Sequence, residues 1–326
     1  MPIREPNLHP AFNIVRVGYV DYLCTDLSRS KAFWVDALGY VLTEETKDAL
    51  YLRGLEERGH HSVVLRNSDQ PGVAGVGFKV FSEQDLDDAA LDCKSRGISH
   101  RFIEKPAQGR TLSIVDPVGM PTEFYFEMQP AECMLRKYGE HRGSQILRID
   151  HANCFTPDVQ TSYDFYNEIG FRPTEYTETE DGKNLWAIWM HRKGNVHDLA
   201  FTNGRGPRLH HMGVWVGSMN PIIHTCDVLA TTGWLKNIER GPGRHGISNA
   251  FFLYLRDPDG HRIELFNSDY LTVDPDQKPL RWDLRDPQRQ TLWGAPAPKS
   301  WFEEGSVFAG HPVRDPLLEA QPIVAP

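Results

Sequence analysis

Cysteine pairs, basic tracts and long apolar runs are all missing from this sequence. Its five cysteines are odd in number and none forms a Cys-x-x-Cys pair, which argues against a disulfide framework and a thiolate zinc site. No stretch approaches the ~18 consecutive apolar residues of a membrane span. With 35 Lys and Arg and 44 Asp and Glu, the net charge is −9, so neither nucleic acid nor an anionic membrane is an expected partner. Because the first residues also lack the apolar stretch of a secretory signal, we expect a cytoplasmic protein.

The composition is that of a globular protein with a generous supply of histidine. Apolar residues make up 40% and charged residues 24% of the 326 residues, a length that allows two domains at ~150 residues each. Ten of the 14 histidines lie from His141 onward. Because imidazole is a common metal ligand and titrates near neutral pH, these histidines indicate a metal or acid–base site in the second half.

A short pattern recurs along the chain: an apolar strand, a polar turn, and a helix that ends in Gly plus an aromatic residue. In the second half a strand begins at residue 148, Asp158 is expected to cap a helix, and Phe165-Tyr166 lies on that helix. Asp26 and Phe33-Trp34 occupy the same places 132 residues earlier. The constant offset predicts that the two segments fold alike.

Two further copies begin near residues 75 and 208, and each closes in a tight hairpin turn. The turns are Asp116-Pro-Val-Gly119 and Asp257-Pro-Asp-Gly260, and each begins 7 residues before a glutamate, Glu123 or Glu264. The sequence therefore predicts an α+β protein of four βαβββ modules, paired into domains at 1–143 and 144–272. Residues 273–326 are rich in proline and hold three tryptophans, which favours a wrapping tail over a third domain.

Superposition of the third and fourth copies predicts a three-ligand metal site. His151 and His211 take equivalent places on two related strands. His210 is not expected to share their cavity, because neighbouring strand side chains point to opposite faces. Glu264 lies in an alternating strand that leaves its carboxylate on one face. Two imidazoles and one carboxylate can bind Fe(II) or Mn(II) and leave positions open for a chelating substrate and O₂.

The first domain serves as an internal control for this site. Tyr19 and Gly75 hold the places of the two histidines, and only Glu123 remains at the place of the glutamate. We therefore expect no metal site in this domain and interpret Glu123 as a polar strand residue.

With these residues the sequence resembles the type I extradiol ring-cleaving catechol dioxygenases of the vicinal oxygen chelate superfamily. The similarity covers nearly all of the chain and is carried by the segments 149–153, 189–197, 204–211, 240–245 and 254–264. The branch that it resembles best is that of the homoprotocatechuate (3,4-dihydroxyphenylacetate) 2,3-dioxygenases. The resemblance implies a vicinal oxygen chelate fold, with a curved mixed sheet in each domain, a homotetramer, and a tail that covers the active site.

The resemblance also implies a reaction and the residues that serve it. A catechol would chelate Fe(II), or alternatively Mn(II), beside O₂, and both oxygen atoms would enter a product of the 2-hydroxymuconate semialdehyde type. The implied catalytic residues are His197 as the acid–base group, His245 and Tyr254 as hydrogen-bond partners of the substrate, and Asn153 in the cavity. Without the resemblance, His197 is equally well explained as an ordinary strand histidine, and His245 is better explained as a solvated histidine of a flexible loop. Tyr254 could then be a buried aromatic residue with a satisfied hydroxyl.

Substrate binding is implied for a second group of residues: Arg240 and Ser248 at carboxylate-binding positions, Trp189 against the ring, and Arg289 and Trp301 in the closing tail segment. The branch has two adjacent arginines where this chain has Arg289 followed by Gln290. One charge fewer weakens carboxylate recognition or favours another substituted catechol. We expect 3,4-dihydroxyphenylacetate as the substrate.

Two other functions stay open on the sequence alone. A glyoxalase-like metal-dependent isomerase or thiol transferase would use a similar site, but usually with a fourth protein ligand, and none is evident. A non-catalytic small-molecule binding protein would share the modules, but it would not need His197, His245 and Tyr254 beside the three ligands.

Overall fold

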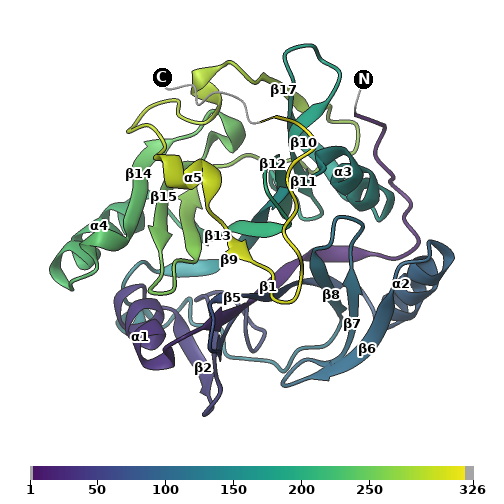
Figure 1. The fold of residues 1–326 in the computed structure, drawn as a ribbon. Coiled ribbons are helices and arrows are strands. Elements are labelled where there is room, and N and C mark those ends of the chain that lie inside the picture. Colours follow the sequence, from purple (N-terminus) through teal and green to yellow (C-terminus); the bar gives the residue numbers. More distant parts are fainter. Residues whose placement is uncertain (1–2, 320–326) are drawn as a thin grey trace.

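The computed structural model describes residues 3–319 and is built on two mixed β-sheets, one from each half of the chain (Figure 1). The ends of the first predicted domain and of the predicted tail, residues 1–2 and 320–326, lie outside the described part. No helix within residues 3–319 is both long and apolar enough to cross a membrane.

Each sheet is assembled from two units of a strand, a helix and three strands. The first two units are β1 (Ile14–Cys24), α1 (Leu27–Lys31), β2 (Val41–Glu45), β3 (Ala49–Arg53), β4 (Val63–Asn67), and β5 (Gly72–Val80), α2 (Gln84–Ser95), β6 (His100–Lys105), β7 (Gly109–Val115), β8 (Pro121–Tyr125). The other two are β9 (Ile146–Thr156), α3 (Val159–Glu168), β10 (Arg172–Glu178), β11 (Leu185–His191), β12 (Leu199–Asn203), and β13 (Arg208–Val216), α4 (Met219–Thr231), β14 (Ile238–Arg244), β15 (Phe251–Arg256), β16 (Arg262–Asn267). The predicted α+β fold of four βαβββ modules is therefore confirmed.

The two sheets share one strand order. In the N-terminal sheet β2-β3-β4-β1 joins β5-β8-β7-β6, and in the C-terminal sheet β14-β15-β16-β13 joins β9-β12-β11-β10. The opening strands of the paired units meet antiparallel at the centre, β1 with β5 and β9 with β13. Each opening strand also pairs in parallel with the last strand of its own unit. The sheet centre thus brings opening and closing strands of two units side by side, where the predicted ligands lie.

Local signals in the sequence fix where the paired helices begin. The Asp26 carboxylate accepts the backbone N–H groups of Ser28 and Arg29, and the Asp158 carboxylate accepts that of Thr161. Both aspartates therefore cap helix N-termini as predicted, because they satisfy donors that have no partner within the helix. After α1 the chain continues as a π-helical segment, Ala32–Ala37.

The repeat is used twice to join the two halves. The indole N–H of Trp34 donates to the Asp257 carboxylate at 3.1 Å, from the first module to the closing turn of the fourth. The hydroxyl of Tyr166 donates to the Asp116 carboxylate at 3.2 Å, from the third module to the closing turn of the second. All four side chains are buried. At the interface, each half therefore donates a hydrogen bond from its first module to the closing-turn aspartate of the other half.

The segment after β16 runs back over both halves, as the yellow chain in Figure 1 shows. Its strand β17 (Leu280–Asp283) extends the C-terminal sheet beside β10, and β18 (Ser306–Val307) pairs with β13. Between them lies the short helix α5 (Lys299–Glu303). Beyond β18 the backbone N–H of Ala309 bonds the Val73 carbonyl of the N-terminal half.

Candidate metal centre and active site

Three ligand side chains converge at the centre of the C-terminal sheet. His151 on β9 and His211 on β13 place their Nε2 atoms 3.1 Å and 3.0 Å from Oε2 of Glu264 on β16. The two Nε2 atoms are 3.2 Å apart, and the three ligand atoms lie within 4.8 Å of one another. All three side chains are buried. Two imidazoles and one carboxylate gathered on one side suit a divalent ion such as Fe(II) or Mn(II), so the predicted triad is present.

Neighbouring groups orient the His151 ring. Its Nδ1 lies 3.1 Å from the carboxylate of Asp150, which fixes the proton on Nδ1 and leaves Nε2 to bind a metal. Burial lowers the pKa of His151, but the bonds to Asp150 and Glu264 raise it above its ordinary value overall. Gly213 pairs with His151 across the strands, and a Cβ there would lie 2.0 Å from the ring. Only glycine leaves room for the imidazole at this place.

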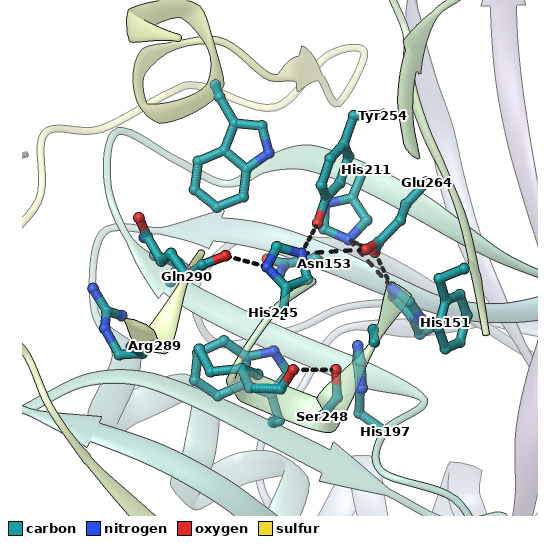
Figure 2. Close-up of a pocket in the computed structure, with 16 residues that line it drawn as sticks. His151, Asn153, His197, His211, His245, Ser248, Tyr254, Glu264, Arg289 and Gln290 are labelled. Carbon is teal, nitrogen blue, oxygen red and sulfur yellow. Dashed lines mark hydrogen bonds and ion pairs between the residues drawn. The ribbon is translucent and has the colours of Figure 1, made fainter. Parts of the chain in front are cut away.

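A second hydrogen-bonded set joins the triad to the tail. The Tyr254 hydroxyl on β15 lies 2.9 Å from Nε2 of His245, whose Nδ1 contacts the backbone carbonyl of Gln290. Since a carbonyl only accepts, Nδ1 carries the proton and Nε2 accepts from Tyr254. Nε2 of His245 is also 3.5 Å from Oε1 of Glu264. Figure 2 shows the rings of His245, His211 and His151 turned toward this carboxylate.

His197 lies beside the triad as a neutral imidazole. Its ring centroid is 3.9 Å from that of His151, and its Nδ1 has no hydrogen-bond partner in the part of the chain that the structure describes. Burial, together with the nearby His151 and Lys193, holds the pKa of His197 well below its ordinary value. The imidazole is therefore uncharged at neutral pH.

These side chains line one small cavity of about 50 Å³ (Figure 2). The predicted site residues that line it are His151, Asn153, Trp189, His197, His211, His245, Ser248, Tyr254, Glu264, Arg289 and Trp301. They come from five strands, two loops and the tail. The structure thus brings together residues that lie up to 150 positions apart in the sequence.

Arg240 is the one predicted substrate-binding residue that does not line this cavity. Its guanidinium carbon lies 4.6 Å from the centre of the Trp301 ring and 4.8 Å from that of Phe252. One of its nitrogens donates to the Gln290 carbonyl at 3.0 Å and to the Thr291 hydroxyl at 2.7 Å. Its hydrogen bonds to the tail therefore support the tail behind the cavity wall. Its stacking on two rings keeps its charge away from the cavity.

Arg289 is placed differently, in a short 3₁₀ helix of the tail, Pro287–Arg289. It is 7% exposed, lines the cavity, and forms no ion pair with any of the residues 3–319. Burial lowers its pKa to about 10, so the side chain is still a cation at neutral pH. Because a buried cation without a counter-ion is costly, Arg289 is suited to bind an anionic group.

His210 follows the expected strand alternation only in part. A β-bulge lies between Leu209 and His211 in the pairing of β13 with β9. His211 lines the metal cavity, and His210 lines a neighbouring chamber instead. The bulge nevertheless brings the two rings into contact, which strict alternation does not predict.

The N-terminal counterpart of the site holds a lysine. The hydroxyl of Tyr19 bonds the Glu123 carboxylate, as His151 contacts Glu264, and Nζ of Lys105 lies 2.6 Å from the same carboxylate. Gly77 takes the place of Gly213, since a Cβ there would meet the Tyr19 ring at 2.2 Å. An ammonium group from the chain itself therefore balances the buried Glu123.

A second cluster of ligand types is formed by Cys24, Asp257 and His261. Both ring nitrogens of His261 are already engaged, Nδ1 with the Ser306 hydroxyl at 2.7 Å and Nε2 with the Leu23 carbonyl at 3.0 Å. Burial raises the pKa of the Cys24 thiol, which keeps it protonated. Because a metal needs a free imidazole nitrogen and a thiolate, this cluster is a structural hydrogen-bond network.

Three functional residues escaped the sequence analysis: Asp150, Gly213 and Thr202, which also lines the cavity. Gly213 had a detectable signal, because Gly77 and Gly213 follow Gly75 and His211 by the same two positions. Asp150 and Thr202 had none, since nothing in their spacing marks an acid or a hydroxyl beside a metal site.

Comparison with known proteins places this site in a family. The model of the Glyoxalase/Bleomycin resistance protein/Dioxygenase superfamily matches residues 16–124 and 148–265. The solved homoprotocatechuate 2,3-dioxygenase of Arthrobacter globiformis is 40% identical, with a TM-score of 0.90, over 95% of this chain and 98% of that one. The complex of the Brevibacterium fuscum enzyme with 3,4-dihydroxyphenylacetate is 38% identical, with a TM-score of 0.90, over 96% and 99%.

A curated relative is more distant in sequence but equally complete. The manganese-dependent 2,3-dihydroxybiphenyl 1,2-dioxygenase of Geobacillus genomosp. 3 is 29% identical over 88% of this chain and 95% of its own length. The matches span both halves of the chain, and the triad lies at the centre of the C-terminal sheet. The fold and the metal site therefore both agree with membership in the family of these proteins. The chain therefore belongs to the Glyoxalase/Bleomycin resistance protein/Dioxygenase superfamily and, within it, to the metal-dependent extradiol dioxygenases.

Proposed function

We propose that this protein is an Fe(II)-dependent dioxygenase that cleaves 3,4-dihydroxyphenylacetate beside its diol and adds both atoms of O₂. The observation that carries the proposal is the buried, unpaired Arg289 in the same cavity as the triad. A catechol alone needs no cation there, whereas an acetate substituent does. The relatives with 37–40% identity that are homoprotocatechuate dioxygenases support the same substrate.

The triad His151, His211 and Glu264 would hold the ion, which when bound supplies the redox and Lewis-acid chemistry for O₂ and the diol. The ligand set accepts Fe(II) and Mn(II) alike, and one relative is a manganese enzyme, so Mn(II) is the alternative.

The remaining cavity residues would handle protons and orientation. His197, neutral and without a partner at Nδ1, would take a proton from the diol or return one later in the reaction. The Tyr254–His245 pair presents a hydroxyl and an imidazole to a substrate oxygen beside Glu264. Trp189 would pack against the ring, and Asn153 would be the polar catalytic residue of the cavity wall. Arg289 would bind the carboxylate, with Ser248 nearby, while Arg240 would act through the tail.

The segment 273–326 is proposed to close the site. Three of its residues, Arg289, Gln290 and Trp301, line the cavity, which supports this role. We propose the domains 1–143 and 144–272 as the structural and metal-binding halves. The homotetramer expected from the resemblance stays a prediction, which light scattering on the purified protein would measure.

The proposal is tested with anaerobically purified protein loaded with Fe(II), Mn(II) or Zn(II). We expect 3,4-dihydroxyphenylacetate in air to give a yellow product, with one O₂ consumed per substrate, in the Fe(II) form and not in the Zn(II) form. Glu264→Ala serves as the control without a complete triad. Bound Fe(II) or Mn(II) without colour from any diol would reject the proposal and favour a glyoxalase-like isomerase or a binding protein.

A further inference from the structure

A second, larger chamber adjoins the metal cavity. Its volume is about 660 Å³, against about 50 Å³ for the cavity that holds the triad. The residues that line both spaces are Asn153, Thr202, Arg289, Gln290 and Trp301. Because the two spaces share these lining residues, they lie side by side, and a substituent too long for the metal cavity would extend toward the chamber.

The chamber has apolar walls over much of its surface. Its apolar lining residues include Phe155, Trp186, Leu284, Trp301, Phe302 and Pro316. Trp186 and Leu284 are buried and belong to one apolar cluster with Trp189, which lines the metal cavity. Such walls suit an apolar stem that continues from an aromatic ring.

Two cations of the chamber lack a carboxylate partner. Arg289 stands in the shared wall, and Arg208 lies beyond it with its guanidinium carbon 5.3 Å from the centre of the Phe155 ring. Neither forms an ion pair with any residue between 3 and 319. Stacking on an aromatic ring holds a guanidinium in one orientation, which prepares Arg208 to bind a carboxylate.

The acidic groups of the chamber are occupied by other partners. Glu304 pairs with Arg256 at 3.0 Å, and Glu303 pairs with Lys299 at 3.4 Å. Asp286 accepts the backbone N–H of Gln288 at 2.9 Å. The third cation, Arg205, is exposed and pairs with Asp315 at 2.9 Å. Asp286 has no cationic partner among residues 3–319, but the two unpaired arginines, Arg208 and Arg289, outnumber it, so positive charge is in excess in the chamber.

We infer that this chamber binds the side chain of catechols whose 4-substituent has an apolar stem longer than one methylene and ends in a carboxylate. This inference rests on the proposed function, because the diol must occupy the metal cavity. The carboxylate of an acetate would meet Arg289 in the shared wall, and a longer stem would carry the carboxylate into the chamber that Arg208 lines. The chamber thus widens the substrate class from arylacetates to longer arylalkanoates.

The test compares kcat/KM for four diols with the Fe(II) enzyme: 4-methylcatechol, 3,4-dihydroxyphenylacetate, 3-(3,4-dihydroxyphenyl)propanoate and 3,4-dihydroxycinnamate. We expect the two longer acids to be cleaved within about tenfold of the acetate. Arg208→Ala should lower kcat/KM for the longer acids by about tenfold or more, the size of a lost charge-assisted hydrogen bond, and change the acetate value by less than threefold. Arg101→Ala removes an exposed arginine of β6, outside both spaces, and is the control, for which we expect no change with any diol.

The outcomes distinguish a failure of the chamber assignment from a failure of the proposed function. Cleavage of the acetate with longer acids at least a hundredfold slower would overturn the chamber assignment alone. An equal loss for all four diols in Arg208→Ala, with an unchanged melting temperature, would overturn it as well. Failure to cleave any diol would reject the proposed function and the chamber assignment together.

Discussion

The Nδ1 atoms of His210 and His211 lie 2.6 Å apart, and Nε2 of His210 lies 2.7 Å from the backbone carbonyl of Trp301. Since this carbonyl only accepts, His210 carries its proton on Nε2, and its bare Nδ1 accepts the proton on Nδ1 of His211. His211 is thereby held in the tautomer that leaves Nε2 free for a metal. One histidine next to a ligand thus links the metal site to helix α5 of the tail.

This contact predicts unequal losses of metal in two neighbouring variants. His211→Ala removes a ligand and should abolish retention of Fe(II) through gel filtration. His210→Ala keeps all ligands but frees the His211 ring, so we expect the affinity to fall about 10–100-fold. Metal content by mass spectrometry and a competition titration with a chelator measure both. Equal loss in the two variants would show that the strand register is wrong.

His197 should be needed for turnover and not for metal binding. In His197→Gln we expect kcat to fall about 10²–10⁴-fold, the usual contribution of a general acid–base group, with Fe(II) content unchanged. Stopped-flow absorbance in air gives the rate. His191→Gln is a control at a buried histidine that contacts Thr272 and Lys193 outside the cavity. Unchanged kcat in His197→Gln would remove His197 from the reaction.

Arg289 should decide affinity for the carboxylate and nothing else. Arg289→Gln is expected to raise KM for 3,4-dihydroxyphenylacetate about 10–100-fold, because a buried charge-assisted hydrogen bond is lost. KM for 4-methylcatechol, which has no carboxylate, should change little. Arg285→Gln removes an exposed tail arginine paired with Asp283 and serves as the control. A similar rise of KM for both diols would point to a damaged tail instead.

The interface carboxylate Asp116 should make stability depend on pH. Burial raises its pKa from an ordinary 3.8 to about 7, although backbone N–H groups and Tyr166 partly oppose this rise. The folded protein therefore binds more protons than the unfolded chain between about pH 4 and 7, and this contribution to stability falls as pH rises through that window.

Asp116→Asn tests this directly, because an amide keeps the shape and still accepts the backbone N–H groups of Val118 and Met120. We expect the difference in unfolding free energy, variant minus wild type, to grow in favour of the variant from pH 4 to 7, by up to about 1.4 kcal/mol per pH unit. Urea unfolding at several pH values measures it. A constant difference over this range would contradict the raised pKa.

The metal ligands and the helix starts could be predicted from the sequence because the chain repeats. A strand histidine has little meaning alone, but His151 and His211 recur at one module position and Glu264 closes the same module that His211 opens. The central pairing of β9, β13 and β16 then places the three side chains together. Helix starts at Asp26 and Asp158 are local too, since a cap depends on groups within one turn.

The tertiary structure decided what depends on contacts between distant segments. The place of the tail determines that Arg289 lines the cavity and Arg240 does not, although both were equally plausible cations in the sequence. A bulge in β13 turns His210 from an excluded neighbour into a partner of His211. Strand alternation and helix caps are properties of a short stretch of backbone. A bulge depends on how one strand pairs with another. The width of a cavity and the burial of an unpaired charge depend on which separate segments pack together and exclude water.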